Sequence, residues 1–230
     1  MVIKFLDLKA QYIKYKKEIN TAIFKTINNS TFIGGNTKGN FEKKFSEFVK
    51  AKYCIGVANG TDAIEISLES LNLKKYSEVI VPSNSFISTS EAVTRSGLKV
   101  VFCDISKDNY TIDTKKILKL INRNTSAIIA VHLYGHPCNM DSLIKIKRKY
   151  KLKIIEDCAQ AQGAKFKNKL VGNFGDFGCF SFYPTKILGA YGDGGFITTN
   201  SIKMFKTVRR LRFYGIEQID KKNKFNGLYY

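Results

Sequence analysis

A carboxylate and an amine that could serve one cofactor occur in a single stretch of this chain, at Asp157 and Lys186. Asp157 belongs to the acidic pair Glu156-Asp157, which ends the apolar run Lys153-Ile154-Ile155 of a predicted buried strand, and Lys186 precedes a glycine-rich turn. Pyridoxal phosphate needs a lysine that forms a Schiff base with its aldehyde and an acid that keeps its pyridine nitrogen protonated. The pair therefore indicates a pyridoxal phosphate site, although an ordinary strand-end acid and a surface lysine would also explain it.

A glycine-containing turn, Asn59-Gly60-Thr61-Asp62-Ala63, lies between a predicted strand and a predicted helix. Glycine permits close backbone approach, the free N–H groups at a helix start attract an anion, and the Thr61 hydroxyl adds a donor. Gly60, Thr61 and Asp62 are therefore candidates for binding the cofactor phosphate, and Ser181 could reach the same group. A capping turn with Thr61 or Asp62 as N-cap is the alternative.

Two further side chains could contact the cofactor ring. Phe86 follows the strand-like run 79–81 and could stack on a flat heterocycle, or it could be a core residue beneath the next helix. Gln160 could hydrogen-bond the phenolic oxygen of the ring, while Asp157 holds the pyridine nitrogen through a charge-assisted bond. The catalytic candidates are thus Lys186 and Asp157, and the other residues would bind cofactor.

Short apolar runs alternate with helical patterns from Tyr53 onwards. Strands are expected over 53–57, 79–81, 99–103, 127–131, 152–155, 178–182 and 196–199, and helices over 8–27, 37–50, 63–71, 85–96, 113–121, 141–150 and 202–213. Because strands that are apolar throughout are buried on both faces, we expect an α/β fold with a mainly parallel sheet and helices on both faces. In such sheets ligands bind at the carboxyl ends of the strands.

The chain of 230 residues has a formal net charge of +19, from 38 Lys and Arg against 19 Asp and Glu. Lysines predominate and are spread from end to end, whereas base recognition and planar phosphate clamps favour arginine. We therefore expect a solvated lysine surface first, an anionic small substrate second, and no nucleic-acid partner.

The sequence gives little indication of disulfides, a metal site or a membrane segment. The five cysteines are widely spaced without a CxxC pair, which predicts small buried residues in a reducing compartment. His132 and His136 have the spacing of a metal pair on a helix, but Gly135 and Pro137 indicate a loop, so no metal site is predicted. No apolar run is long enough for a membrane span and no signal peptide is recognisable, so we expect a cytoplasmic protein.

Together these stretches resemble the DegT/StrS-type sugar aminotransferases, which are pyridoxal-phosphate enzymes of the aspartate-aminotransferase fold. The resemblance is carried, in order, by FLDL at 5–8, NGTDA at 59–63, VHLYG at 131–135, EDCAQ at 156–160, SFYPTK at 181–186 and GDGG at 192–195. It implies N-terminal helices and a cofactor-binding large domain over residues 1–230. It also implies Lys186 as Schiff-base lysine, Asp157 on the pyridine nitrogen, Phe86 on the ring, Gln160 at its oxygen, and Thr61, Asp62 and Ser181 around the phosphate.

The reaction implied by the resemblance moves an amino group from an amino acid, usually glutamate, to a keto group of a nucleotide-linked sugar for surface polysaccharide or amino-sugar synthesis. Lys186 would transfer the proton between the α-carbon of the donor and the cofactor. A dehydratase branch of the family carries histidine in place of this lysine, so Lys186 favours amino transfer. A homodimer is expected for a full-length member.

Two departures from the family pattern stand out. Gln162 occupies a position where members often carry histidine. The family also continues into a glycine-x-asparagine-x-arginine segment, which contributes to the partner subunit's site, and into a smaller C-terminal domain, and neither is recognised here. We therefore expect a C-terminally truncated chain, for which an inactive remnant or a cofactor-binding regulatory protein is the alternative to an active enzyme.

Overall fold

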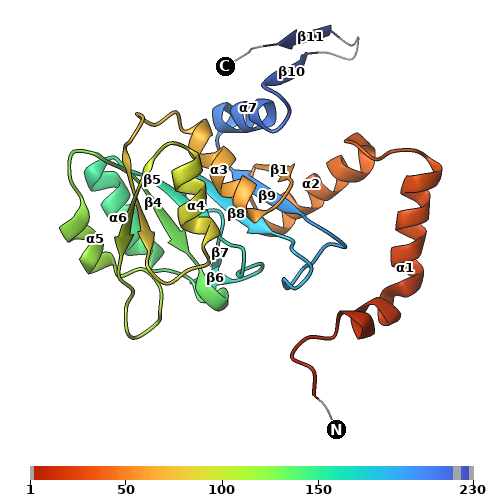
Figure 1. Cartoon of the computed structure of the whole chain (residues 1–230), viewed down its shortest axis with the longest axis horizontal. Coiled ribbons are helices and arrows are strands. Elements are labelled where there is room, and N and C mark those ends of the chain that lie inside the picture. Colours follow the sequence, from red (N-terminus) through yellow and green to blue (C-terminus); the bar gives the residue numbers. More distant parts are fainter. Residues whose placement is uncertain (1–2, 220–223, 228–230) are drawn as a thin grey trace.

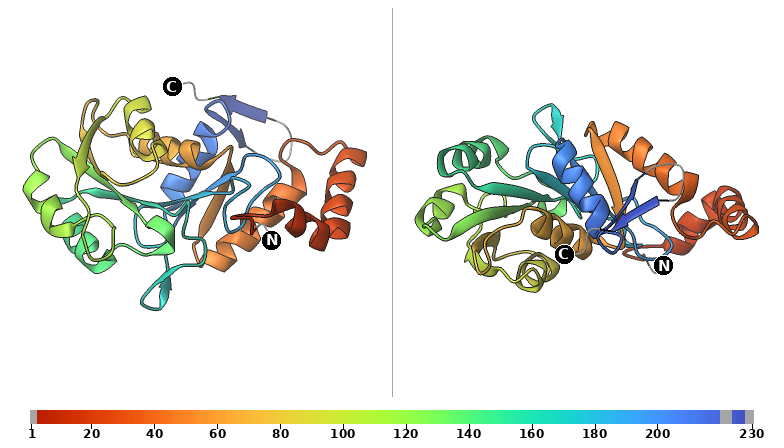
Figure 2. Two further views of the ribbon diagram at one scale, coloured as in Figure 1. Left: turned by 60° about the horizontal axis from the view of Figure 1, so that its bottom comes forward. Right: turned by 90° about the horizontal axis from the view of Figure 1, so that it is seen from above.

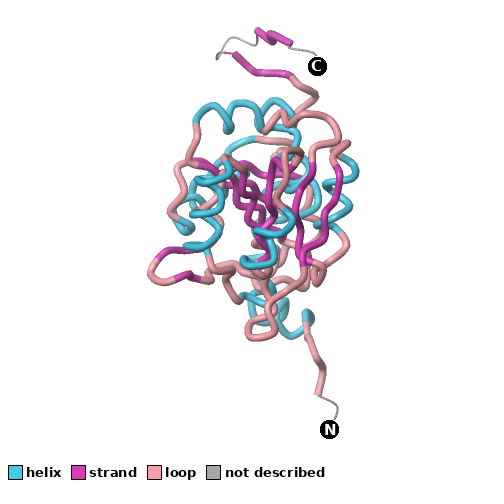
Figure 3. Tube along the Cα trace, turned by 90° about the vertical axis from the view of Figure 1, so that its left-hand side faces the viewer, coloured by secondary structure: helices cyan, strands magenta, loops and turns pink. Residues whose placement is uncertain are grey.

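The computed structural model describes residues 3–219 and 224–227 (Figure 1). A seven-stranded sheet forms the centre, with helices on both faces (Figure 3), which confirms the predicted α/β fold class. The elements, in chain order, are α1 (Leu8–Asn28), α2 (Gly35–Val49), β1 (Tyr53–Val57), α3 (Gly60–Ser70), β2 (Glu78–Pro82), α4 (Ser88–Arg95), β3 (Lys99–Cys103), α5 (Thr114–Leu120), β4 (Thr125–Val131), the 3-10 turn η1 (Leu133–Gly135), α6 (Met140–Tyr150), β5 (Lys153–Asp157), β6 (Lys165–Phe166), β7 (Lys169–Leu170), β8 (Phe177–Ser181), β9 (Gly195–Thr199), α7 (Ile202–Leu211), β10 (Ile216–Ile219) and β11 (Lys224–Gly227).

The order of strands in the large sheet is β1-β9-β8-β5-β4-β2-β3. Strand β9 runs antiparallel to β1 and β8, and the other neighbouring pairs are parallel. The predicted mainly parallel sheet is therefore confirmed. As a consequence, β1, β2, β4, β5 and β8 all end at the same edge of the sheet, where their following loops meet.

The core lies on both faces of the sheet because the central strands are apolar at successive positions. In β2, Val79 and Val81 pack with α3, α4 and α7, whereas Ile80 packs with α5 and α6 on the opposite face. Helix α2 places Phe45 against the phenylalanines of β8 and β9. All five cysteines are buried and free, as predicted.

The sequence located the elements of the large sheet correctly and some of their ends less well. Helix α4 starts at Ser88 instead of residue 85, and this leaves Ser85 and Phe86 in a loop. The β6–β7 hairpin and the 3-10 turn η1 were not predicted, because two- and three-residue elements have no periodicity to detect. No helix in the described part of the chain is both long and apolar enough to cross a membrane.

Helix α1 stands away from the rest of the molecule (Figure 1 and Figure 2). None of its residues is buried, and its backbone is kinked at Tyr15. Apolar side chains nevertheless recur along it, with Ile13, Phe24 and Ile27 between half and two-thirds exposed. An amphipathic helix with an uncovered apolar face indicates a surface that packs against another polypeptide.

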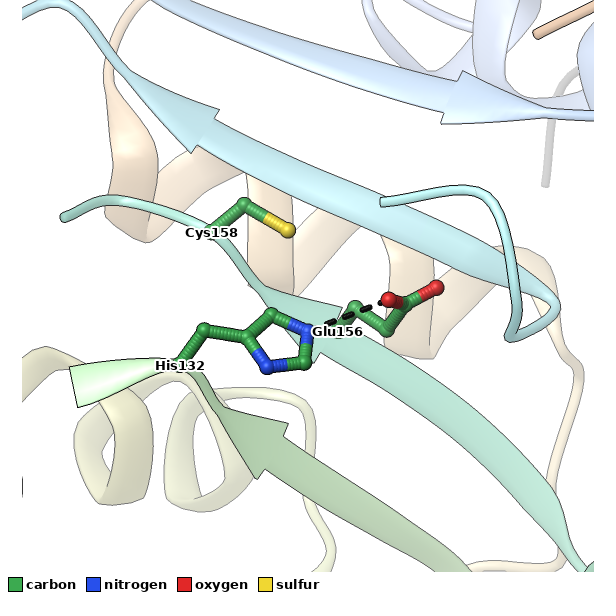
Figure 4. Close-up of side chains that lie close together, drawn as sticks. All are labelled: His132, Glu156 and Cys158. Carbon is green, nitrogen blue, oxygen red and sulfur yellow. Dashed lines mark hydrogen bonds and ion pairs between the residues drawn. The ribbon is translucent and has the colours of Figure 1, made fainter. Parts of the chain in front are cut away.

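A buried carboxylate on β5 fastens the loop that precedes β8. Glu156 is fully buried and accepts hydrogen bonds from the backbone N–H groups of Gly172, Phe174 and Gly175 and from Nε2 of His132 (Figure 4). Burial alone would raise the pKa of Glu156, but the hydrogen bonds from His132 and from these amides hold it below its ordinary value of 4.5. Glu156 is therefore an ionised anchor whose four donors satisfy its charge.

We expect Glu156→Gln to destabilise the fold by about 3–5 kcal/mol, because an amide would point its own N–H groups at the N–H donors that surround it. Urea unfolding at neutral pH measures this. Since the folded-state pKa lies below 4.5, the stabilisation is present above that pH and is lost as the pH falls through the folded-state pKa. The exposed control Glu47→Gln should change stability by about 0.5 kcal/mol or less, and an equal effect of both variants would contradict this role for Glu156.

Candidate active site

A cavity of about 580 Å³ opens at the carboxyl ends of the parallel strands. Its volume is typical of a site for a cofactor-sized molecule. The residues that line it include Asn59, Gly60, Thr61, Ser85, Phe86, Ser88, Asp157, Gln160, Ser181, Tyr183, Thr185, Lys186 and Asp193. Seven of the eight predicted site residues thus lie around one space, although they come from four separate parts of the chain.

Lys186 lies on a loop that leaves the sheet after β8 and returns to it at β9. The base of this loop is closed by a hydrogen bond from the Ala190 N–H to the Phe182 carbonyl, 2.7 Å long, and the Lys186 N–H donates to the Tyr183 carbonyl at 2.8 Å. The side chain of Lys186 lines the cavity together with Asp157. The amine is therefore carried by a closed loop, and its position depends on what fixes that loop.

Asp157 is the charged group on the sheet side of the cavity, with 7% of the residue exposed. Its carboxylate accepts from the Thr89 hydroxyl at 3.0 Å and from the Ala159 N–H at 3.1 Å. Burial raises the pKa of Asp157, and these two donors together with the positive charge of Lys186 oppose that rise. A cation placed in the cavity beside Asp157 would therefore stabilise its ionised form.

A chain of hydroxyl groups orients this carboxylate. Thr89 uses its only hydroxyl proton for Asp157, so the 2.8 Å contact between Ser85 and Thr89 must have Ser85 as donor. These hydroxyl residues were not predicted as site residues. Their signal in the sequence is the run Pro-Ser-Asn-Ser-Phe-Ile-Ser-Thr-Ser after β2, which is unusually rich in hydroxyl groups for a loop leading to a helix.

The start of helix α3 offers backbone donors to the cavity. Asn59 is the N-cap: its side chain accepts from the Asp62 N–H at 2.8 Å and its carbonyl accepts from the Ala63 N–H. The N–H groups of Gly60 and Thr61 have no acceptor among the described residues. These two amides are available to an anion at the positive end of an 11-residue helix.

Hydroxyl groups surround the same two amides. Thr61 donates to Ser88 at 2.8 Å, so Ser88 joins the predicted pair of Thr61 and Ser181 at this end of the cavity. A Cβ added at Gly60 would lie 2.8 Å from that of Ser181, so glycine is what lets α3 approach β8 this closely. Asp62 is not among the lining residues, and the capping role considered for Thr61 or Asp62 belongs to Asn59.

Gln160 and Phe86 also line the cavity. The Gln160 side-chain oxygen accepts from the Tyr134 N–H at 2.8 Å, and this leaves its amide nitrogen as the free donor toward the cavity. Phe86 lines the cavity and is 71% exposed, so it is not the core residue that was the alternative prediction. An exposed ring at the edge of a cavity can stack on a flat ligand.

The sequence pattern of the DegT/DnrJ/EryC1/StrS aminotransferase family matches residues 14–229. The chain belongs to this family. It is 44% identical over 227 residues to a dTDP-3-amino-3,6-dideoxy-alpha-D-galactopyranose transaminase of Aneurinibacillus thermoaerophilus, a match that covers 99% of this chain and 62% of that relative.

Solved structures of the family superimpose closely on this chain. The structure of Streptomyces venezuelae DesV in complex with a ketimine intermediate matches with a TM-score of 0.91 at 35% sequence identity. This match covers 99% of the present chain and 61% of the DesV chain. NtdA of Bacillus subtilis with bound cofactor PMP has a TM-score of 0.90 at 32% identity, with 99% of this chain covering 52% of it. The chain thus spans between about half and two-thirds of the length of these family members.

A buried cluster beside the site has ligand-type side chains, His132, Glu156 and Cys158, within 4.8 Å of one another (Figure 4). Nδ1 of His132 accepts from the Cys138 N–H at 3.0 Å and Nε2 faces Glu156 at 3.1 Å, so both ring nitrogens are engaged. Burial raises the pKa of the Cys158 thiol to about 12, whereas metal binding requires the thiolate. The cluster is therefore a hydrogen-bonded anchor, and the exposed His136 is not part of it.

Gln162 clamps the lysine loop at both ends. Its amide nitrogen donates to the Ser181 carbonyl at 2.6 Å and lies 3.4 Å from the Leu188 carbonyl, while its oxygen accepts from the Leu188 N–H at 2.9 Å. A carboxamide can make this donor and acceptor pair in a single orientation. Gln162 therefore fixes the two ends of the segment that carries Lys186.

We expect Gln162→Leu to cost about 1–3 kcal/mol, because it leaves buried backbone groups of the loop unpaired. The Leu188 amide should then exchange its hydrogen faster, which hydrogen exchange with mass spectrometry detects. In Gln162→His, whose side chain offers one donor and one acceptor, the Leu188 amide should exchange at an intermediate rate. Gln11→Leu on the exposed face of α1 is the control, and unchanged exchange at Leu188 in Gln162→Leu would refute the clamp.

Proposed function

We propose that this chain carries the cofactor site of a pyridoxal-phosphate-dependent aminotransferase that moves an amino group from an amino acid, L-glutamate, to a keto group of a nucleotide-linked sugar. The observation that supports this most strongly is the convergence of Lys186, Asp157 and the α3 amides on one cavity. Membership of the family and the transaminase names of its relatives agree with it.

The donor set fits pyridoxal phosphate group by group. The unpaired amides of Gly60 and Thr61, with the Ser181 hydroxyl, suit a phosphate. Asp157 is buried and forms no ion pair with any side chain that the structure describes, so its charge is available to a protonated pyridine nitrogen. Lys186 supplies the amine for the aldehyde. When bound, the cofactor provides that aldehyde and an electron-accepting ring.

The residues of this chain would then divide the work of proton transfer. Asp157, oriented by Thr89, would hold the proton on the ring nitrogen, and a protonated ring draws electrons. The Lys186 amine would act as the base that takes the proton from the α-carbon of the donor and, once protonated, as the acid that returns it. The amide N–H of Gln160 would be the donor to the ring oxygen, and Phe86, at the edge of the cavity, would stack on one face of the ring.

Several finer assignments belong to the same proposal. The relative from Aneurinibacillus thermoaerophilus is named for a 3-amino sugar, which supports a 3-keto sugar as acceptor here. Residues 1–230 would form N-terminal helices and the cofactor-binding domain of a cytoplasmic enzyme. A second copy of the chain would cover the apolar face of α1, since 21 residues of helix without one buried side chain need a partner. Sedimentation at increasing protein concentration tests that association.

Reconstitution with pyridoxal phosphate tests the proposed function directly. We expect an imine absorption band that borohydride reduction fixes on Lys186, identified by peptide mass spectrometry. Lys186→Arg retains the charge but cannot form the imine, so it should lose the band completely. Asp157→Asn should bind the cofactor about tenfold or more weakly, because it removes a charge-assisted hydrogen bond.

A second step separates an enzyme from the alternatives. Adding glutamate to the reconstituted chain should shift the band as the amino group is transferred. A band on Lys186 that glutamate leaves unchanged would indicate an inactive remnant or a cofactor-binding regulatory protein. Absence of any band in the wild-type chain would overturn the proposed function.

A further inference from the structure

The loop that carries Lys186 joins β8 to β9 and is fastened at its base. Gln162 holds its two ends, and a hydrogen bond from the Ala190 N–H closes it. The residues that follow, 191–193, make no hydrogen bond with any residue that the structure describes. Asp193 nevertheless lines the active-site cavity together with Lys186. This side of the lysine loop therefore depends on contacts of another kind.

Such a contact comes from helix α1. The ring of Tyr12 meets the ring of Tyr191 edge to face, with the ring centroids 6.2 Å apart and the ring planes at 72° to each other. This geometry is favourable because the positive edge of one ring approaches the negative face of the other. Tyr191 is 65% exposed, so the contact is not a consequence of general burial of the loop. A helix that stands away from the sheet thus touches the loop of Lys186.

The shape of α1 makes this contact possible. The backbone of the helix is kinked at Tyr15, where φ is −114° and ψ is 18°. Across the kink, the Tyr12 hydroxyl donates a hydrogen bond to the side-chain oxygen of Asn20 at 3.0 Å. In a straight α-helix, residues eight positions apart are separated by about 12 Å along the axis, which is too far for this bond. The Tyr12 hydroxyl therefore braces the kink, while its ring lies against Tyr191.

The position of the loop matters because Lys186 reacts only from the conformation in which its amine faces the cavity. An edge-to-face aromatic pair is strong enough to shift a loop equilibrium about two- to tenfold. The apparent affinity of a ligand for a protein falls in proportion to the fraction of molecules in the competent conformation. A contact at Tyr191 can therefore alter the chemistry of Lys186 without touching the cavity.

We propose that the first turns of α1, residues 8–14, form a strap that holds the lysine loop from outside. In this strap Tyr12 is a positioning residue that acts on Lys186 through Tyr191, and neither tyrosine lines the cavity. The strap follows from the contacts of the chain, whereas its effect on imine formation rests on the proposed function.

Hydrogen exchange with mass spectrometry tests the strap in the chain without cofactor. We expect Tyr12→Leu and Tyr191→Leu each to raise the exchange rate of the loop peptide that contains the Ala190 amide about two- to tenfold, because each removes the aromatic pair. The double variant should exchange no faster than either single variant, since the same contact is lost in all three. Tyr191→Phe keeps the ring and should exchange as the wild type does. Tyr76→Leu removes an exposed ring from the turn before β2 and is the matched control.

Titration with pyridoxal phosphate tests whether the strap positions Lys186. Tyr12→Leu and Tyr191→Leu should weaken the affinity measured from the imine band about twofold or more, because the competent loop conformation is less populated. Tyr191→Phe should bind as the wild type does. The melting temperature should be the same in all of these variants, since the aromatic pair joins exposed segments, and this separates positioning from a loss of global stability.

The outcomes separate this inference from the proposed function. Equal exchange rates in the wild type and in both leucine variants would overturn the strap, as would additive effects in the double variant. Faster exchange with unchanged imine affinity would refute the positioning role of Tyr12. A wild-type chain without an imine band would refute the proposed function, whereas the exchange rates would still decide whether α1 holds the loop.

Discussion

Two consecutive acidic residues at the end of β5 point to opposite faces of the sheet, and the structure depends on what each one meets there. Side chains alternate along a strand, so Glu156 and Asp157 cannot share an environment. Glu156 meets four N–H donors and holds the loop before β8 in place. Asp157 meets only a hydroxyl and one amide, and its carboxylate retains the capacity to accept from a ligand. One strand end thus supplies both an anchor for the fold and the negative charge of the site.

The cavity exists because parallel strands bring their loops to one edge. Each loop contributes one type of group: amides after β1, hydroxyls after β2, the carboxylate at the end of β5, and the amine after β8. None of these groups could bind a cofactor by itself. Bringing together residues that are far apart in the chain costs conformational entropy, and packing of the sheet offsets this cost. The position of Lys186 depends in turn on Gln162, which ties the lysine loop back to the segment that follows Asp157.

The positively charged side chains of this protein are of two kinds, those spread over the surface and those gathered at one place. Most lysines are solvated and keep a positive field over the surface, which attracts anions without specifying them. At the end of α7, in contrast, Lys206, Arg209, Arg210 and Arg212 lie together with Lys38 around one cavity. The net charge of +19 therefore does not by itself distinguish a solvated surface from a binding site, and the distribution of the charges does.

The sequence alone determined the parallel α/β architecture, because strand burial and helix periodicity are local patterns. It also predicted Lys186, Asp157, Thr61 and Gln160 as site residues, and the structure places them around one cavity. Only the tertiary structure showed that Asn59 caps α3, that Gln162 clamps the lysine loop, that Ser88 lines the cavity and that Thr89 donates to Asp157. The ion pair between Arg212 and Glu42 was equally invisible, since it joins residues that lie 170 positions apart in the sequence. Local patterns encode the elements, whereas contacts between residues far apart in the chain form only when the sheet closes its core.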